Sequence, residues 1–326
     1  MKQDKINEIK TLINFFIDKY QINSILVALS GGQDSMYLIK TLKNLEKLEF
    51  KKKITISYIY VDHQWKYSSN KQVKHIINYI KFINTNIIIY QISKNTLSED
   101  ECRRYRYKII LQHAIRYQHR LIITGHNKTD KIETFIQNII RGSGIENLNN
   151  LAMKTKITNN IFILRPLLIL NRNIIYWLCK KFHLPIWSDN TNYIYSIQRN
   201  RIRCELIPYL KKYMHNNIEN NIQYLLKHYY HQNEYIKQNV VKIYLRSKHD
   251  VRIAINCKKI NTQNLVLQMR IIQMFCFHNF QIYIEHQKII RIIKDINTLT
   301  KGLVKITQYE GFNFLVTNSW LYLTIK

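Results

Sequence analysis

The chain has 326 residues, with 50 lysines and arginines against 21 acidic residues, which gives a formal net charge of +29. Hydrophobic residues make up 46% of the composition, enough to bury a substantial core, so a fully disordered basic tail is excluded. So large a positive charge indicates a polyanionic partner, with nucleic acid first and an anionic membrane surface second. No run approaches the ~18 uncharged apolar residues of a membrane-spanning helix, so we expect no membrane segment.

The five cysteines are far apart and odd in number, and they form neither a CxxC pair nor a zinc-binding spacing. We therefore expect a reducing compartment and thiols that act as small buried hydrophobic residues. The N-terminus has no apolar signal stretch, and a glycine-rich loop already begins at residue 30, so we expect no cleavable targeting segment. Abundant Ile, Asn, Lys and Tyr beside only 7 Gly and 3 Pro are typical of an AT-rich genome, such as that of an organelle or a reduced bacterium.

Hydrophobic periodicity predicts an opening amphipathic helix and then strands that alternate with helices. The expected strands cover residues 24–29, 54–61, 86–92 and 121–124, and the expected helices follow the loop at 30–35 and then cover 76–83, 101–119 and 129–141. This alternation predicts an α/β fold with a Rossmann-like parallel sheet, covered by helices on both faces, whose ligand crevice lies at the C-terminal ends of the strands.

The alternation stops around residues 165–208, and apolar stripes typical of helices take over. Turn signals at 311 and 318–319 predict short strands near the C-terminal end. We therefore expect a catalytic domain over 1–210 and a smaller, mostly helical domain over 211–326 that ends in short strands and binds RNA.

The segment at 30–35 lies between the first predicted strand and a helix, and it consists of Ser30, Gly31, Gly32, Gln33, Asp34 and Ser35. Two successive glycines let the main chain turn tightly and present bare N–H groups to an anion, and the helix N-terminus adds positive potential. The Gly-Lys ending of a Walker loop is missing. Asp34 would repel phosphates unless a divalent cation lies between them, so it is a candidate Mg²⁺ ligand. The alternative interpretation is a tight turn with a capping serine.

This loop resembles the SGGxDS loop of the ATP pyrophosphatases, which split ATP into AMP and diphosphate to activate a carbonyl oxygen. That superfamily includes tRNA thiolases, GMP and NAD synthetases, and tRNA(Ile)-lysidine synthases. Further motifs are similar to those of the last family, in unbroken order over about residues 20–210. They are VDH at 61–63, ExxxRxxRY from Glu99 to Tyr107, GHNKTDKIET at 125–134 for GHHxDDxxET, RGSG at 141–144, RPLL at 165–168, DNTN at 189–192 for DxSN, and RNRIR at 199–203 for RNxIR.

The resemblance implies an adenine nucleotide α hydrolase-like fold and a ligase that forms a carbon–nitrogen bond. In that reaction free L-lysine is joined to carbon 2 of the wobble cytidine in the CAU anticodon of tRNA(Ile), through an adenylated tRNA, so that the codon read changes from AUG to AUA. The implied cofactors are ATP and Mg²⁺. The implied partners are tRNA(Ile) and lysine, and the oligomeric state, monomer or homodimer, stays open. No second C-terminal subdomain is evident, so the chain resembles a short form.

The resemblance also implies roles for single residues. Asp34 and Asp130 would hold Mg²⁺, and with His126 and Arg103 they would form the catalytic group. His63 and Arg106 would join the loop in binding ATP. The implied substrate-binding residues are Glu133, Arg141, Arg199, Asn200 and Arg203.

Each role has a plainer alternative. The histidines could be core-edge residues, and Glu99 and Arg103 could be an ordinary surface pair. Gly142 and Gly144 could simply end a helix. Arg199 and Arg203 share one helical face and could be solvated.

Two departures from the family pattern bear on the site. Thr129 stands where the family has the first of two aspartates, and Gln64 and Trp65 replace a Gly-Leu pair. A tRNA thiolase is one alternative, although a thiolase needs a cysteine pair or cluster and the spacing offers none. A non-catalytic basic tRNA-binding protein on the same fold is another, supported by Thr129. We expect location in the plastid (chloroplast) stroma if the chain is organelle-encoded, and otherwise in a bacterial cytoplasm.

Overall fold

A computed structural model of the chain describes residues 2–48, 54–64, 69–92, 99–148, 151–158, 160–187, 195, 197–298, 304–309, 311–317 and 319–325. The chain divides into two compact units, Met1–Leu226 and Lys227–Lys326. The boundary falls within one long helix, α10 (Ile218–Ser247). The assignment of a catalytic role to 1–210 and of RNA binding to 211–326 stays a prediction.

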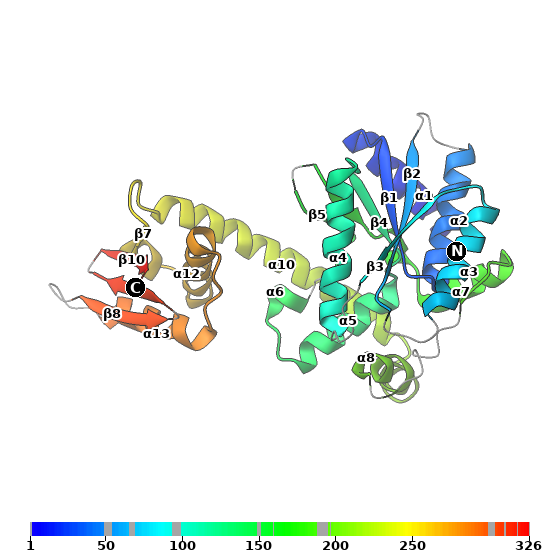
Figure 1. Cartoon of the computed structure of the whole chain (residues 1–326). Helices are drawn as coiled ribbons and strands as arrows, with labels where there is room; N and C mark the ends of the chain where they lie inside the picture. Colours follow the sequence, from blue (N-terminus) through cyan, green and yellow to red (C-terminus); the bar gives the residue numbers. More distant parts are fainter. Residues whose placement is uncertain are drawn as a thin grey trace. The chain divides into compact units, whose positions relative to one another are not determined.

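A six-stranded sheet forms the centre of the first unit, with strand order β3-β2-β1-β4-β6-β5 (Figure 1). All neighbours pair in parallel except β5 and β6, which are antiparallel. The strands are β1 (Ser24–Leu29), β2 (Thr55–Asp62), β3 (Ile87–Gln91), β4 (Leu121–Thr124), β5 (Lys154–Lys156) and β6 (Phe162–Leu164). The predicted parallel α/β sheet is therefore confirmed, and its central strand β1 leads directly into the glycine loop.

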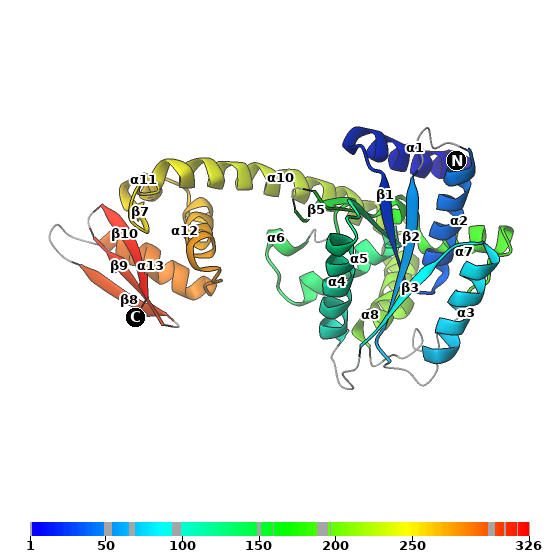
Figure 2. The same ribbon diagram turned by 45° about the horizontal axis from the view of Figure 1, so that its top comes forward.

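Helices cover both faces of this sheet (Figure 2). Both faces are apolar because side chains of successive strand residues point to opposite faces. On β1, Ile25 and Val27 join a core formed with α1, α2, α3 and α7, whereas Leu26 joins a core on the other face with residues of α4. The helices of the unit are α1 (Lys2–Tyr20), α2 (Gln33–Leu48), α3 (Ser69–Phe82), α4 (Glu99–Arg116), α5 (Lys128–Ile140), α6 (Ile145–Leu148) and α7 (Arg172–Lys181), with the 3-10 turn η1 at Pro166–Ile169.

A continuous helical run with two π-helical stretches follows toward the end of the first unit. It consists of α8 (Gln198–Arg201), η3 (Ile202–Leu206), α9 (Ile207–Tyr209) and η4 (Leu210–Met214). Pro208 has no N–H and its ring would clash with the carbonyl four residues earlier, so a regular α-helix cannot pass through it. The Ile207 N–H instead bonds to the Ile202 carbonyl, five residues back, and both isoleucines are buried.

The second unit packs helices against a four-stranded antiparallel sheet of order β7-β10-β9-β8. Its core includes Tyr244, Phe275, Ile292, Phe314 and Leu321. The elements after α10 are β7 (Ala254–Asn256), α11 (Cys257–Asn261), α12 (Leu265–Phe280), α13 (His286–Thr298), β8 (Lys305–Tyr309), β9 (Phe312–Val316) and β10 (Trp320–Ile325). The predicted helical region ending in short strands is confirmed; the sequence pattern did not reveal β7.

The cysteines behave as small hydrophobic side chains, as expected. All five are free thiols, and four are buried while Cys204 is partly exposed. Within the described ranges, no helix is long and apolar enough to cross a membrane.

Two buried histidines lie in the last turn of α4 and just before β4. His113 and His119 are 3% and 6% exposed, with ring centroids 5.7 Å apart. Burial lowers the pKa of both imidazoles below the ordinary value. Each also bonds to a hydroxyl, His113 Nδ1 to Tyr90 at 3.0 Å and His119 Nδ1 to Ser24.

We predict that this pair makes the fold sensitive to acid. Because the unfolded chain takes up protons near pH 6.5 and the folded chain resists them, stability should fall as the pH drops below about 6.5. Urea midpoints measured between pH 7.5 and 5 should fall less steeply in the double variant His113→Gln/His119→Gln than in the native chain. The exposed His228→Gln is the matched control, and equal pH slopes in all three proteins would contradict the prediction.

Candidate active site

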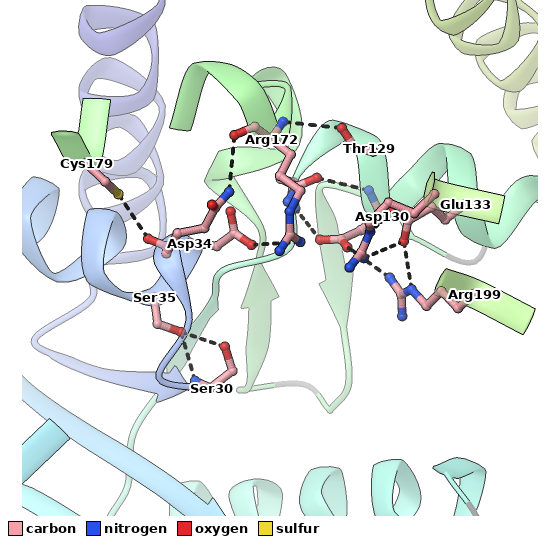
Figure 3. Close-up of polar contacts among 12 residues, drawn as sticks. Ser30, Asp34, Ser35, Thr129, Asp130, Glu133, Arg172, Cys179 and Arg199 are labelled. Carbon is pink, nitrogen blue, oxygen red and sulfur yellow. Dashed lines mark hydrogen bonds and ion pairs between the residues drawn. The ribbon is translucent and has the colours of Figure 1, made fainter. Parts of the chain in front are cut away.

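The glycine loop closes on itself at the C-terminal end of β1. The Ser30 N–H donates to Ser35 Oγ at 2.8 Å, and the two hydroxyl oxygens are 2.9 Å apart (Figure 3). The Gly32 carbonyl accepts the first helical bond of α2, from the Met36 N–H at 3.2 Å. The first N–H groups of α2 therefore have no partner within the helix, which makes this end of α2 suited to bind an anion.

Gly31 is required by the backbone and by the space around it. Its φ is +78°, and a Cβ there would lie 2.8 Å from both Gln72 Nε2 and Ile76 Cδ1. Gln72, on α3, donates to the Ser30 carbonyl at 3.0 Å. Helix α3 thus holds the loop from outside, and only glycine fits between them.

Asp34 lies in the first turn of α2 with an incomplete set of partners. Its Oδ1 is buried without a hydrogen bond, and Arg172 Nη1 is 4.0 Å from Oδ2. Burial, with the negative charge of Asp130, raises the pKa of Asp34 to about 7, against the opposing effect of Arg172. Figure 3 shows the Asp34 and Asp130 side chains directed toward the same region. A Cβ on Gly125 would lie 3.4 Å from the Asp34 carbonyl carbon, so the motif at 125–134 packs directly on the loop.

Asp130 lies in the first turn of α5 and forms a capping box with the N-cap residue Asn127. The Asp130 N–H donates to Asn127 Oδ1, and the Asn127 N–H donates to Asp130 Oδ2, both at 3.0 Å. The other oxygen, Oδ1, accepts from Arg199 Nη2 at 2.9 Å and lies 3.6 Å from Arg203 Nη2. Burial would raise the pKa of Asp130, but Arg199, the Asn127 N–H and Arg203 together hold it below its ordinary value.

Glu133 lies one turn further along α5, on the same face as Asp130, and is fully buried. It accepts from Arg199 Nε at 2.8 Å, and from Arg203 Nε at 2.6 Å and Nη2 at 2.8 Å. The two arginine side chains are only 21% and 17% exposed, so the alternative that they are merely solvated is excluded. The motifs at 125–134 and 199–203 therefore meet as one buried ion-pair network (Figure 3).

The two motif histidines are held neutral. Burial lowers the pKa of His126 to about 3, although Asp130 opposes this shift, and Arg165 and Arg103 add to it. His126 Nδ1 lies 2.9 Å from Thr124 Oγ1. His63 Nε2 accepts from Arg106 Nε at 3.0 Å, and burial and then Arg106 lower the pKa of His63 to about 4. The predicted pair of His63 and Arg106 therefore lies in direct contact.

The remaining predicted residues lie at the end of α5 and in α8. Arg141 is the exposed C-cap of α5, and Gly142, with φ +68°, closes the helix through the bonds Gly142 N–H to Ile139 O and Ser143 N–H to Asn138 O, both 2.9 Å. Gly142 therefore ends the helix, which was the plainer alternative to a role in substrate binding. Asn200 is buried in α8. The motif at 189–192 and Trp65 lie outside the described residues, as does the side chain of Glu99.

Sequence reasoning missed Arg172, which joins three parts of the site. Its N–H donates to Thr129 Oγ1 at 3.3 Å, and its carbonyl accepts from Gln33 Nε2 at 3.2 Å, while its guanidinium faces Asp34. Thr129, which departs from the family pattern, thus positions Arg172 instead of supplying a carboxylate. The available signal was a cation in the first turn of a helix, where the helix dipole disfavours it.

The site fits Mg²⁺ bound largely through phosphates. Within the described ranges, no group of three or more His, Cys, Asp or Glu side chains is placed to hold a metal ion. Mg²⁺ often takes one or two carboxylates and completes its shell with water and substrate phosphates. The unpartnered Oδ1 of Asp34 suits such a ligand. Both oxygens of Asp130 already accept hydrogen bonds, so its role as a metal ligand stays a prediction.

Comparison with known proteins shows the family to which the chain belongs. Residues 3–210 match the family model of the PP-loop domain. The chain is 45% identical over 301 residues, 92% of each protein, to the chloroplastic tRNA(Ile)-lysidine synthase of Gracilaria tenuistipitata var. liui. It is 32% identical over 93% of its length, and 91% of the relative, to that of Pyropia yezoensis. The chain therefore belongs to the tRNA(Ile)-lysidine synthase family of PP-loop proteins.

A solved structure shares the fold. A tRNA thiolase from Methanococcus maripaludis, which carries an iron–sulfur cluster, matches with a TM-score of 0.56 at 18% identity, over 70% of this chain and 80% of the thiolase.

We predict that Gly31→Ala destabilises the loop. The left-handed φ should cost about 1–2 kcal/mol, and displacing Gln72 would break its bond to the Ser30 carbonyl. Urea unfolding should show this loss. Gly144→Ala, where a Cβ meets nothing within 4 Å, is the control, and equal stabilities of the two variants would contradict the prediction.

We predict that Glu133→Gln is far more destabilising than the same change at Glu205. Removing the charge of Glu133 leaves Arg199 and Arg203 poorly compensated in a buried site, at a cost of about 3–5 kcal/mol. Glu205 pairs with Arg201 at the surface, where the cost should stay within about 1 kcal/mol. Urea unfolding of both variants measures the difference in the free energy of unfolding. Similar losses in the two variants would contradict the prediction.

Proposed function

We propose that this protein ligates free L-lysine to the wobble cytidine of tRNA(Ile) with a CAU anticodon, using ATP and releasing AMP and diphosphate. The proposal rests on three features that lie close together. They are the glycine loop, which leads into the free N–H groups of α2, the buried Asp34 oxygen that has no hydrogen bond, and the ion-pair network of the 125–134 and 199–203 motifs. The relatives named as tRNA(Ile)-lysidine synthases, which match 92% and 93% of this chain, support it.

The loop would hold the diphosphate that leaves ATP. The N-terminal amides of α2 supply donors that need no rearrangement, which favours charge developing on the departing group. Because the Ser30 and Ser35 hydroxyls bond each other, one of their two protons is left to donate to the phosphate. Asp34 would hold Mg²⁺, which neutralises phosphate charge when it is bound. The raised pKa of Asp34, about 7, supports this role because a nearby cation would return the carboxyl to its charged form.

Neutral His126 and the arginines around it have separate tasks. With a pKa of about 3, His126 is unprotonated at neutral pH, so it can accept or donate a hydrogen bond without adding charge. Arg103 and Arg106 would face phosphate, for which a planar guanidinium is well suited. We propose that Glu133 acts mainly as a positioning residue, because both of its oxygens already bind Arg199 and Arg203. Those arginines, with Asn200, would then orient the substrate.

The alternatives receive less support. Sulfur transfer by a thiolase needs accessible cysteines, whereas four of the five cysteines here are buried, and burial raises the pKa of Cys179, Cys257 and Cys276 to about 12. A non-catalytic scaffold was supported by Thr129, but Thr129 has a structural task in holding Arg172. The chloroplastic relatives support a plastid origin, and we propose the stroma as the place of action.

The assay combines the purified chain, Mg²⁺-ATP, radiolabelled lysine and tRNA(Ile) with a CAU anticodon. We predict ATP-dependent label on this tRNA and none on the same tRNA with a GAU anticodon. Asp34→Asn should lower label and diphosphate release by about a hundredfold or more while tRNA retention on filters persists. Asp18→Asn, an exposed position on α1, is the control. Absence of label with intact tRNA binding would contradict the ligase and favour the scaffold.

A further inference from the structure

An exposed aromatic pair lies on the helical run that supplies Arg199 and Arg203. Tyr209 and Tyr213 are 51% and 61% exposed, and their ring centroids are 5.0 Å apart at an interplanar angle of 43°. The Lys212 ammonium lies 4.9 Å from the centroid of the Tyr213 ring. Because the rings are tilted and more than half exposed, a large part of their aromatic surface is open to solvent.

Charge around this pair favours a polyanion. From 198 to 214 the sequence has five basic residues, Arg199, Arg201, Arg203, Lys211 and Lys212, and one acidic residue, Glu205. Four of these cations are in ion pairs: Arg199 and Arg203 with Asp130 and Glu133, Arg201 with Glu205, and Lys211 with Glu219. Lys212 is exposed beside Tyr213. Exposed tyrosines beside an exposed cation are a combination that binds single-stranded RNA, since bases stack on the rings while a phosphate meets the cation.

The backbone of the run explains why the tyrosines face outward. The π-helical stretches on either side of Pro208 put Ile202 and Ile207, five residues apart, on the buried side. Tyr209 and Tyr213 are four residues apart and share the opposite, exposed side. π-helical turns occur frequently at functional sites. With about 1.5 Å per helical residue, the pair lies roughly 9–15 Å along the run from Arg203, which is the reach of a few stacked nucleotides.

We propose that Tyr209 and Tyr213, with Lys212, form a stacking platform for an unpaired base of the substrate RNA, next to the base that enters the active site. This inference rests on the proposed function, because that function supplies a single-stranded RNA loop as the substrate. The platform would hold the splayed loop by ring faces, without reading base edges, while the Arg199 and Arg203 network lies at the reacting end.

The test uses fluorescence anisotropy of the full chain with the anticodon stem-loop of tRNA(Ile), and with a fully paired RNA duplex of equal length. Tyr209→Ala and Tyr213→Ala should each weaken stem-loop binding by about tenfold and leave duplex binding unchanged. Tyr213→Phe, which keeps the ring, should bind as the native chain does. Tyr224→Ala, an equally exposed tyrosine on α10, is the matched control.

The salt dependence separates stacking from charge. Lys212→Gln should reduce the slope of log affinity against log salt by about the amount that one phosphate contact contributes, whereas Tyr213→Ala should leave that slope unchanged. Native affinity in both alanine variants, or equal losses on stem-loop and duplex, would overturn the platform. Lysine incorporation is assayed in parallel: if the native chain transfers lysine while the tyrosine variants bind normally, only the platform fails, and if the native chain transfers none, the proposed function itself fails.

Discussion

Buried negative charge is the constraint around which this site is organised. Asp34, Asp130 and Glu133 gather at the C-terminal edge of a parallel sheet, where uncompensated carboxylates are costly. Arg199 and Arg203 compensate two of them through close hydrogen bonds. Asp34 has its guanidinium, that of Arg172, 4.0 Å away, and one of its oxygens is buried without a hydrogen bond. Burial and the charge of Asp130 therefore raise its pKa. The same carboxylate stands beside bare helix amides, and a cation between Asp34 and phosphate would satisfy both groups.

Arginine and neutral histidine together make the remainder of the site receptive to anions. His63 and His126 carry no charge at neutral pH, because burial beside guanidinium groups lowers the pKa of each. Positive charge is therefore concentrated in arginines, which keep it under all physiological conditions. On the scale of the whole chain, a net charge of +29 suits a partner as large as tRNA, whose phosphates extend well beyond the reacting base.

Features of short range were predictable from the sequence. The strands at 24–29 and 121–124 have the predicted bounds, because buried parallel strands are nearly continuous apolar runs. The glycine loop was recognisable since its chemistry lies in six consecutive residues. The contacts of Gln72 and Arg172 were not predictable, because they join positions far apart in sequence. The engagement of Glu133 by Arg199 and Arg203 likewise depends on how α5 packs against α8 and η3, which no local pattern specifies.

The central claim is that the amides following β1 bind the diphosphate part of ATP beside Asp34. Hydrogen–deuterium exchange of the full chain, with and without Mg²⁺-diphosphate, tests it most directly. We expect slower exchange in the peptide that covers residues 30–36, and loss of this protection in Asp34→Asn. Protection confined to other peptides, with unchanged exchange at 30–36, would contradict it.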